Sequence, residues 1–135
     1  MPKAIKIVLG VLIGFIAWFI VASIGNWVVR ALAPGYAEAD VAMKFTLSMM
    51  LARLGVGAVS SLVAGLVCAM CVRSVPSSVR FLAVALVVFF VPVHYALWSQ
   101  FPLWYHAVFL LSIAPLVIAG GTLAGSVGLG RRSAA

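Results

Sequence analysis

Four long apolar stretches constrain what this chain can fold into. A helix needs about 20 mainly apolar residues to cross a bilayer, and the stretches place spans at about residues 5–30, 45–72, 80–98 and 103–127. Strands of a membrane barrel alternate apolar and polar residues over about ten positions, whereas these stretches are apolar on all sides. The pattern therefore predicts four transmembrane helices, with an amphipathic outward extension of the second span around residues 37–52.

The composition argues against a water-soluble fold. Apolar residues make up 66% of the 135 residues and charged residues only 8%, against about 45–50% and about 25% in soluble domains. A domain of this size leaves much of its surface wet and cannot hide so much apolar area. We therefore expect an all-α integral membrane protein, a single transmembrane domain over residues 1–135. Because its loops are short, it is expected to form an antiparallel up-down four-helix bundle.

The basic residues predict an orientation. With a cytoplasmic N-terminus, the inner ends of the spans carry six basic residues: Lys3, Lys6, Arg73, Arg80, Arg131 and Arg132. The outer ends carry three, which are Arg30, Lys44 and Arg53, beside the two acids of the chain, Glu38 and Asp40. Since cytoplasmic loops are enriched in Lys and Arg, both termini are expected in the cytoplasm, in a bacterial inner (plasma) membrane. The dispersed charges indicate attraction to anionic lipid rather than to nucleic acid.

The spans contain no Asp or Glu, so carboxylate-based proton or sodium coupling within the membrane is not expected. A glycine-rich phosphate loop is also absent from the sequence. We therefore expect no enzymatic chemistry from the chain itself.

Two kinds of short motif are interpreted as packing features. Gly10-x-x-x-Gly14 and the small residues repeated at four-residue spacing over 57–69 allow close helix approach, with an oligomer interface as the alternative. Cys68 and Cys71 form a C-x-x-C sequence near the predicted inner end of the second span. On that reducing side of the membrane, we interpret them as small packing residues.

Arg53 is the charged residue that lies furthest inside an apolar pattern. It precedes Gly57 by four residues, so it shares a helix face with the small residues. A charge at the bilayer centre costs at least about 2.5 kcal/mol, and such residues mark functional sites by default. We expect its partner to be Glu38 or Asp40, backbone carbonyls, a lipid phosphate or an anionic ligand. The alternative is that Arg53 extends to the outer interface.

His94 and His106 flank the last loop of the chain. On antiparallel neighbouring helices their imidazoles lie at a similar depth. Such a pair can relay protons, contact a ligand, ligate a metal ion or a haem, or serve structure alone. A haem- or metal-binding electron-transfer protein that uses His94 and His106 is therefore the alternative function.

The sequence thus predicts a polar and aromatic site in the outer half of the bundle, where Trp and Tyr also favour the interface. Its expected residues are Arg53, His94, His106, Tyr95, Trp98, Trp104 and Asn26. An anionic or amphipathic ligand, or a membrane lipid, suits a single Arg with aromatic neighbours. The expected function is that of an oligomeric transporter or channel, or of an accessory subunit in a membrane complex. Its partners would be lipid and a second copy or another membrane subunit.

Overall fold

The computed structural model describes the backbone of residues 1–133 and the side chains of residues 1–127. Within these residues the chain forms five helices: α1 (Lys3–Leu32), α2 (Tyr36–Ala42), α3 (Leu47–Cys71), α4 (Ser77–Ala96) and α5 (Leu103–Ser133). All but α2 are long and apolar enough to cross a membrane. The prediction of four apolar helices is therefore confirmed.

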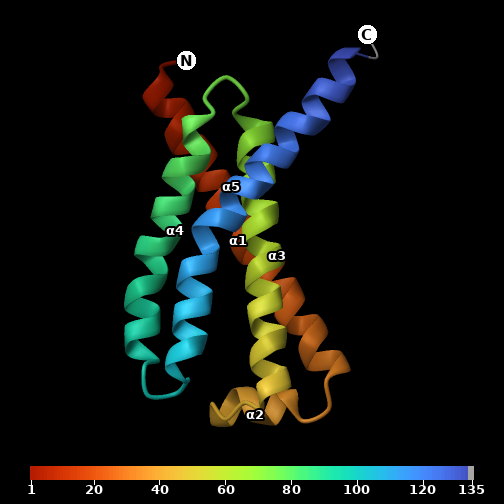
Figure 1. Cartoon of the computed structure of the whole chain (residues 1–135), viewed down its shortest axis with the longest axis vertical. Coiled ribbons are helices and arrows are strands. Elements are labelled where there is room, and N and C mark those ends of the chain that lie inside the picture. Colours follow the sequence, from red (N-terminus) through yellow and green to blue (C-terminus); the bar gives the residue numbers. More distant parts are fainter. Residues whose placement is uncertain (134–135) are drawn as a thin grey trace.

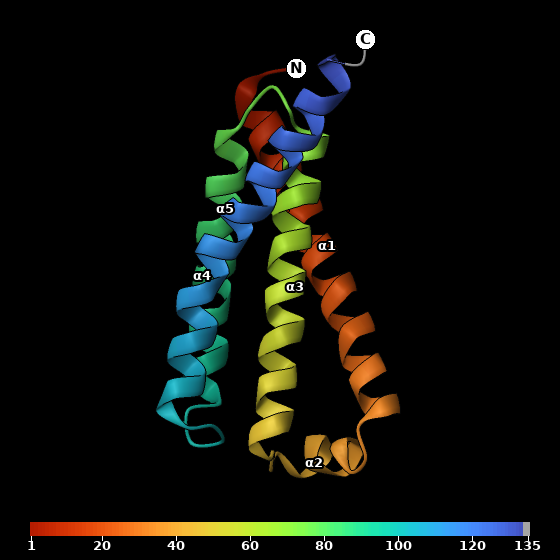
Figure 2. The same ribbon diagram turned by 45° about the vertical axis from the view of Figure 1, so that its right-hand side comes forward.

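The long helices run alternately in opposite directions, so the start of α1 and the end of α5 lie at one end of the bundle (Figures 1 and 2). The connection between α3 and α4 lies at that same end, and α2 lies across the opposite end. In both views α1 is oblique to α3. The helix lengths differ, since α1 has 30 residues and α4 has 20.

The amphipathic extension of the second span, predicted around residues 37–52, is wrong before Leu47, where α3 begins. The chain breaks between α2 and α3 because Met43 adopts a left-handed conformation, with φ of 54°. Gly35, the residue before α2, has the same conformation, with φ of 78°, and glycine adopts it at little cost. Thr46 then caps α3, and its hydroxyl accepts the backbone N–H of Met49 at 3.4 Å. A short separate helix therefore covers the end of the bundle.

The apolar core lies between the long helices. Its largest buried side chains include Trp18, Leu82, Leu86, Phe90, Ile113 and Val117. The outward faces are also apolar, as at Ile16, Val88 and Leu111, which are largely exposed. Such an outer surface fits contact with lipid rather than water.

Glycines set the closest helix approach. A Cβ atom on Gly65 of α3 would overlap the backbone carbonyl of Val117, and one on Gly120 of α5 would overlap that of Leu62. The packing interpretation also fits α1, where Gly10 and Gly14 are buried against α3 and α4. Backbone contact between α3 and α5 therefore requires glycine at these positions.

Gly65→Ala should destabilise the protein by about 1–3 kcal/mol, because the new methyl group has no space beside the Val117 carbonyl. Gly55→Ala, in the same helix, is the control, since a Cβ there meets nothing within 4 Å. Thermal unfolding in detergent measures both. Equal melting temperatures for the two variants would contradict this account of α3–α5 packing.

Candidate ligand-binding site

A cavity of about 300 Å³ opens at the α2 end of the bundle. All five helices contribute to its lining. Its polar and aromatic lining residues are Trp18, Asn26, Asp40, Arg53, Phe90, His94, Phe101, Tyr105 and Phe109. The volume lies at the lower end of the range for small-molecule sites, about 300–1,000 Å³.

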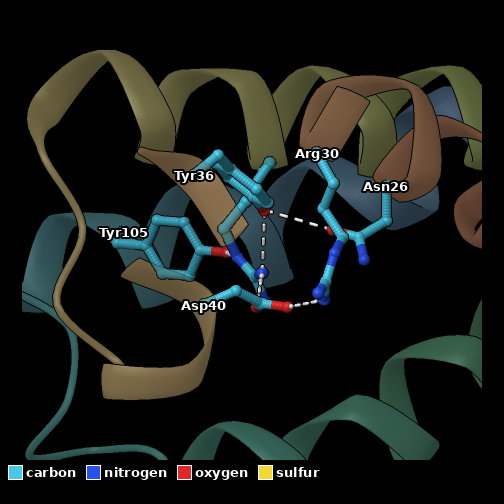
Figure 3. Close-up of polar contacts among 6 residues, drawn as sticks. Asn26, Arg30, Tyr36, Asp40 and Tyr105 are labelled. Atoms are coloured by element: carbon cyan, nitrogen blue, oxygen red, sulfur yellow. Dashed lines mark hydrogen bonds and ion pairs between the residues drawn. The ribbon is translucent and has the colours of Figure 1, made fainter. Parts of the chain in front are cut away.

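Arg53 reaches its partners within the protein. Its Nη1 donates to the hydroxyl of Tyr36 at 3.1 Å and to Oδ1 of Asp40 at 3.4 Å, and its Nε donates to the hydroxyl of Tyr105 at 3.3 Å. The Tyr36 hydroxyl in turn donates to Oδ1 of Asn26 at 3.1 Å. Figure 3 shows these groups converging from four helices. The guanidinium is therefore anchored, and its direction is fixed.

The charges around Arg53 do not cancel. Asp40 accepts from Nη1 of Arg30 at 2.7 Å and from Nη1 of Arg53 at the longer 3.4 Å (Figure 3). Both ion pairs found among the described side chains thus use the same carboxylate. Glu38, on the same short helix, is exposed. Two guanidiniums that share one carboxylate leave an excess of one positive charge, and the less tightly paired of them lines the cavity.

Aromatic rings surround the guanidinium and the rest of the cavity. The Cζ atom of Arg53 lies 4.8 Å from the ring centroid of Phe45 and 5.6 Å from that of Phe101, within cation–π range. Deeper in the bundle, the indole N–H of Trp18 donates to Ser61 Oγ at 3.0 Å. Since that donor is already used, Trp18 presents mainly an apolar surface to the cavity.

The two histidines meet directly. Nδ1 of His94 and Nδ1 of His106 are 2.7 Å apart, and Nε2 of His106 lies 3.3 Å from the backbone carbonyl of Trp98. A carbonyl only accepts, so Nε2 of His106 carries a proton. In a neutral pair, Nδ1 of His106 is then the acceptor and Nδ1 of His94 the donor. The remaining nitrogen, Nε2 of His94, holds an unprotonated lone pair.

The lone pair on Nε2 of His94 is accessible from outside the packed core. Every fully buried side-chain nitrogen or oxygen among the described residues has a hydrogen-bond partner. Nε2 of His94 makes no hydrogen bond within this part of the chain, so it must be accessible. Because His94 lines the cavity, we infer that the cavity is where its lone pair is reached.

A haem or a metal ion at His94 and His106 stays a prediction. The 2.7 Å separation is that of a hydrogen bond, whereas two nitrogens on one tetrahedral zinc, each bonded at about 2.0–2.1 Å, lie more than about 3 Å apart. The described residues contain no group of three or more His, Cys, Asp or Glu suited to a metal. Binding would require the two rings to separate.

The structure brings only some of the predicted site residues together. Arg53, His94 and Asn26 line the cavity. His106 contacts His94 and the backbone carbonyl of Trp98, and neither His106 nor Trp98 is part of the lining. Trp98 stacks on His106, with centroids 4.9 Å apart. Tyr95, which is 82% exposed, and Trp104 are not part of the cavity lining.

Sequence reasoning missed Tyr36, which bonds Arg53, and five aromatic residues of the cavity lining: Trp18, Phe90, Phe101, Tyr105 and Phe109. Two of them could have been recognised from their positions in the sequence, because Tyr36 follows the Pro-Gly turn and Tyr105 directly precedes His106. With them, the cavity offers a fixed cation, an imidazole lone pair and aromatic walls. Comparison with family models, with curated proteins and with solved structures finds no match to this chain.

Asp40→Asn should destabilise the fold by about 1–3 kcal/mol, because two guanidiniums lose the carboxylate that they share. Glu38→Gln removes the other acid of α2, which is exposed, and should leave the melting temperature within about a degree. Thermal unfolding at low ionic strength compares the two variants. If both behaved alike, Asp40 would not be the structural counterion described here.

Proposed function

We propose that this chain is a four-span membrane protein that binds an anionic, amphipathic ligand in the cavity beside Arg53 and serves in the transport of that ligand. The proposal includes no catalysis by the chain itself. The small bundle would act as an oligomer of identical copies, or as an accessory subunit beside a larger membrane protein. Its ligand would share the chemistry of membrane lipids, an acidic head and an apolar body.

The observation that carries this proposal is that two guanidiniums share one carboxylate beside the cavity. Arg53 and Asp40 both line the cavity, but the closer partner of Asp40 is Arg30, which lies outside the lining, so the charge of Arg53 is only partly compensated. A carboxylate, sulfonate or phosphate placed there would gain charge-assisted hydrogen bonds from Arg53. The rings of Trp18, Phe90 and Phe109 would contact the apolar part of the same molecule.

We further propose that the end of the bundle that carries both chain termini is cytoplasmic, in a bacterial inner membrane. Nζ of Lys6 donates to Oγ of Ser74 at 3.1 Å, which ties α1 to the connection between α3 and α4. Lys3, Lys6, Arg73 and Arg80 are therefore grouped at that end, as the enrichment of basic residues on the cytoplasmic side would require. The cavity would then lie in the outer half of the membrane.

Arg53→Gln should weaken binding of decanesulfonate at least about tenfold, because a charge-assisted hydrogen bond contributes about 1.5–3 kcal/mol. Arg30→Gln is the matched comparison: it lowers the local charge by the same amount but leaves the Arg53 donors at the cavity, so its loss of affinity should be clearly smaller than that of Arg53→Gln. Calorimetry on protein in phosphatidylcholine nanodiscs, with empty nanodiscs as blank, measures both. Decanol, which has no charge, should bind wild type and Arg53→Gln equally. Equal losses for the two arginine variants would refute the proposal.

Cys71 provides the test of orientation, because it is exposed while Cys68 is buried. A membrane-impermeant maleimide should label Cys71 in permeabilised spheroplasts and fail to label it in intact ones. Ser99→Cys in a Cys71→Ser background, at the opposite end of the bundle, should be labelled in intact spheroplasts. Efficient labelling of Cys71 from outside would reverse the proposed orientation.

A further inference from the structure

The hydrogen bonds of the His94–His106 pair run in one direction. His94 donates to His106, and His106 donates to the carbonyl of Trp98. The assignment follows from the carbonyl, which cannot donate. Both histidines are buried, at 5% and 2% exposure. The chain of donors thus starts at the cavity and ends at the backbone of the last loop.

This direction leaves one position at which the pair can gain a proton without losing a hydrogen bond. Nδ1 of His94 and Nε2 of His106 already carry protons, and Nδ1 of His106 is occupied as an acceptor. A proton added to Nε2 of His94 keeps both existing bonds, and the new N–H points to accessible space. His94, not His106, is therefore the proton-accepting member.

The charges that face His94 decide when it gains a proton. Arg53 of α3, Asp40 of α2 and Tyr105 of α5 line the same cavity as His94, together with the uncharged Asn26 of α1. The hydroxyl of Tyr36, from α2, is bonded to Arg53 and Asn26. While the cavity holds no anion, the excess positive charge at Arg53 disfavours a second cation beside it. An anion between Arg53 and His94 reverses this effect and accepts the new N–H.

We propose that the cavity binds its anion together with one proton, which His94 holds on Nε2. The inference rests on the proposed function, because it takes Arg53 as the anion site. The proton comes from the surrounding water and forms an N–H bond at the Nε2 lone pair, while no bond of the ligand breaks. The anion and the proton together add no net charge, so the cavity fills without a change in its total charge.

Decanesulfonate is the probe, because a sulfonate stays ionised and cannot itself carry the proton. Calorimetry is performed near neutral pH in phosphate, HEPES and Tris buffers, which differ in their enthalpy of ionisation. The dependence of the observed heat on that enthalpy gives the protons taken up per bound anion. Wild type should take up about one, and its affinity should fall by up to about tenfold per pH unit as the pH rises, because binding is linked to protonation.

Two matched variants assign the proton to one imidazole. In His94→Gln the side-chain amide still donates to His106 but has no basic nitrogen, so the anion should bind more weakly, through Arg53, while proton uptake falls to near zero. In His106→Gln the amide oxygen accepts from His94 and the amide N–H donates to the Trp98 carbonyl, so uptake should be retained. The two substitutions remove equal numbers of imidazoles, and a merely structural pair would respond alike to both.

Each outcome decides the matter. Uptake that is lost only in His94→Gln supports the inference. Binding to wild type without proton uptake overturns it and leaves the proposed function standing. Uptake that survives in His94→Gln assigns the proton to another group, such as Asp40, and also overturns it. No binding of decanesulfonate to wild type overturns both, and the wild-type measurement alone gives this answer if a variant fails to fold.

Discussion

A guanidinium among apolar helices must receive hydrogen-bond acceptors from its own protein, because the hydrocarbon layer of a membrane contains none. Arg53 receives them from Tyr36, Asp40 and Tyr105, which lie on two other helices. Two of the three come from α2, a helix of seven residues. The position of α2, and with it the cavity, thus depends on the hydrogen bonds that Arg53 makes.

The long helices could be predicted from the sequence because a helix that crosses a membrane needs a minimum number of consecutive apolar residues, and each span has them. The break before α3 could not be predicted. Met43 is neither Gly nor Asn, so its left-handed conformation carries no local signal. Tertiary contacts made by Tyr36 and Asp40 fix α2 in place instead. Such contacts link residues that are distant in the chain, and a pattern of apolar residues does not record them.

The sequence predicts how far along the bundle each candidate site residue lies, but not toward which side of its helix the side chain points. Arg53, His94 and His106 were placed together because their distances from the loops put them at similar heights in the bundle. Tyr95 had the same height, yet it lies next to His94 on α4 and is turned about 100° away around the helix, where it is largely exposed. Tyr105 was missed for the converse reason, since its hydroxyl matters only once Arg53 is beside it.

The unequal lengths of the helices have a mechanical consequence. At about 1.5 Å per residue, α1 is about 45 Å long and α4 about 30 Å, close to the thickness of the hydrocarbon layer. A helix as long as α1 would tilt to match the membrane, and its tilt would change with bilayer thickness. Trp18 and Asn26 lie on α1 and form one wall of the cavity. A thicker membrane would reduce the tilt of that wall, and the width of the cavity would then change with the lipid composition around the protein.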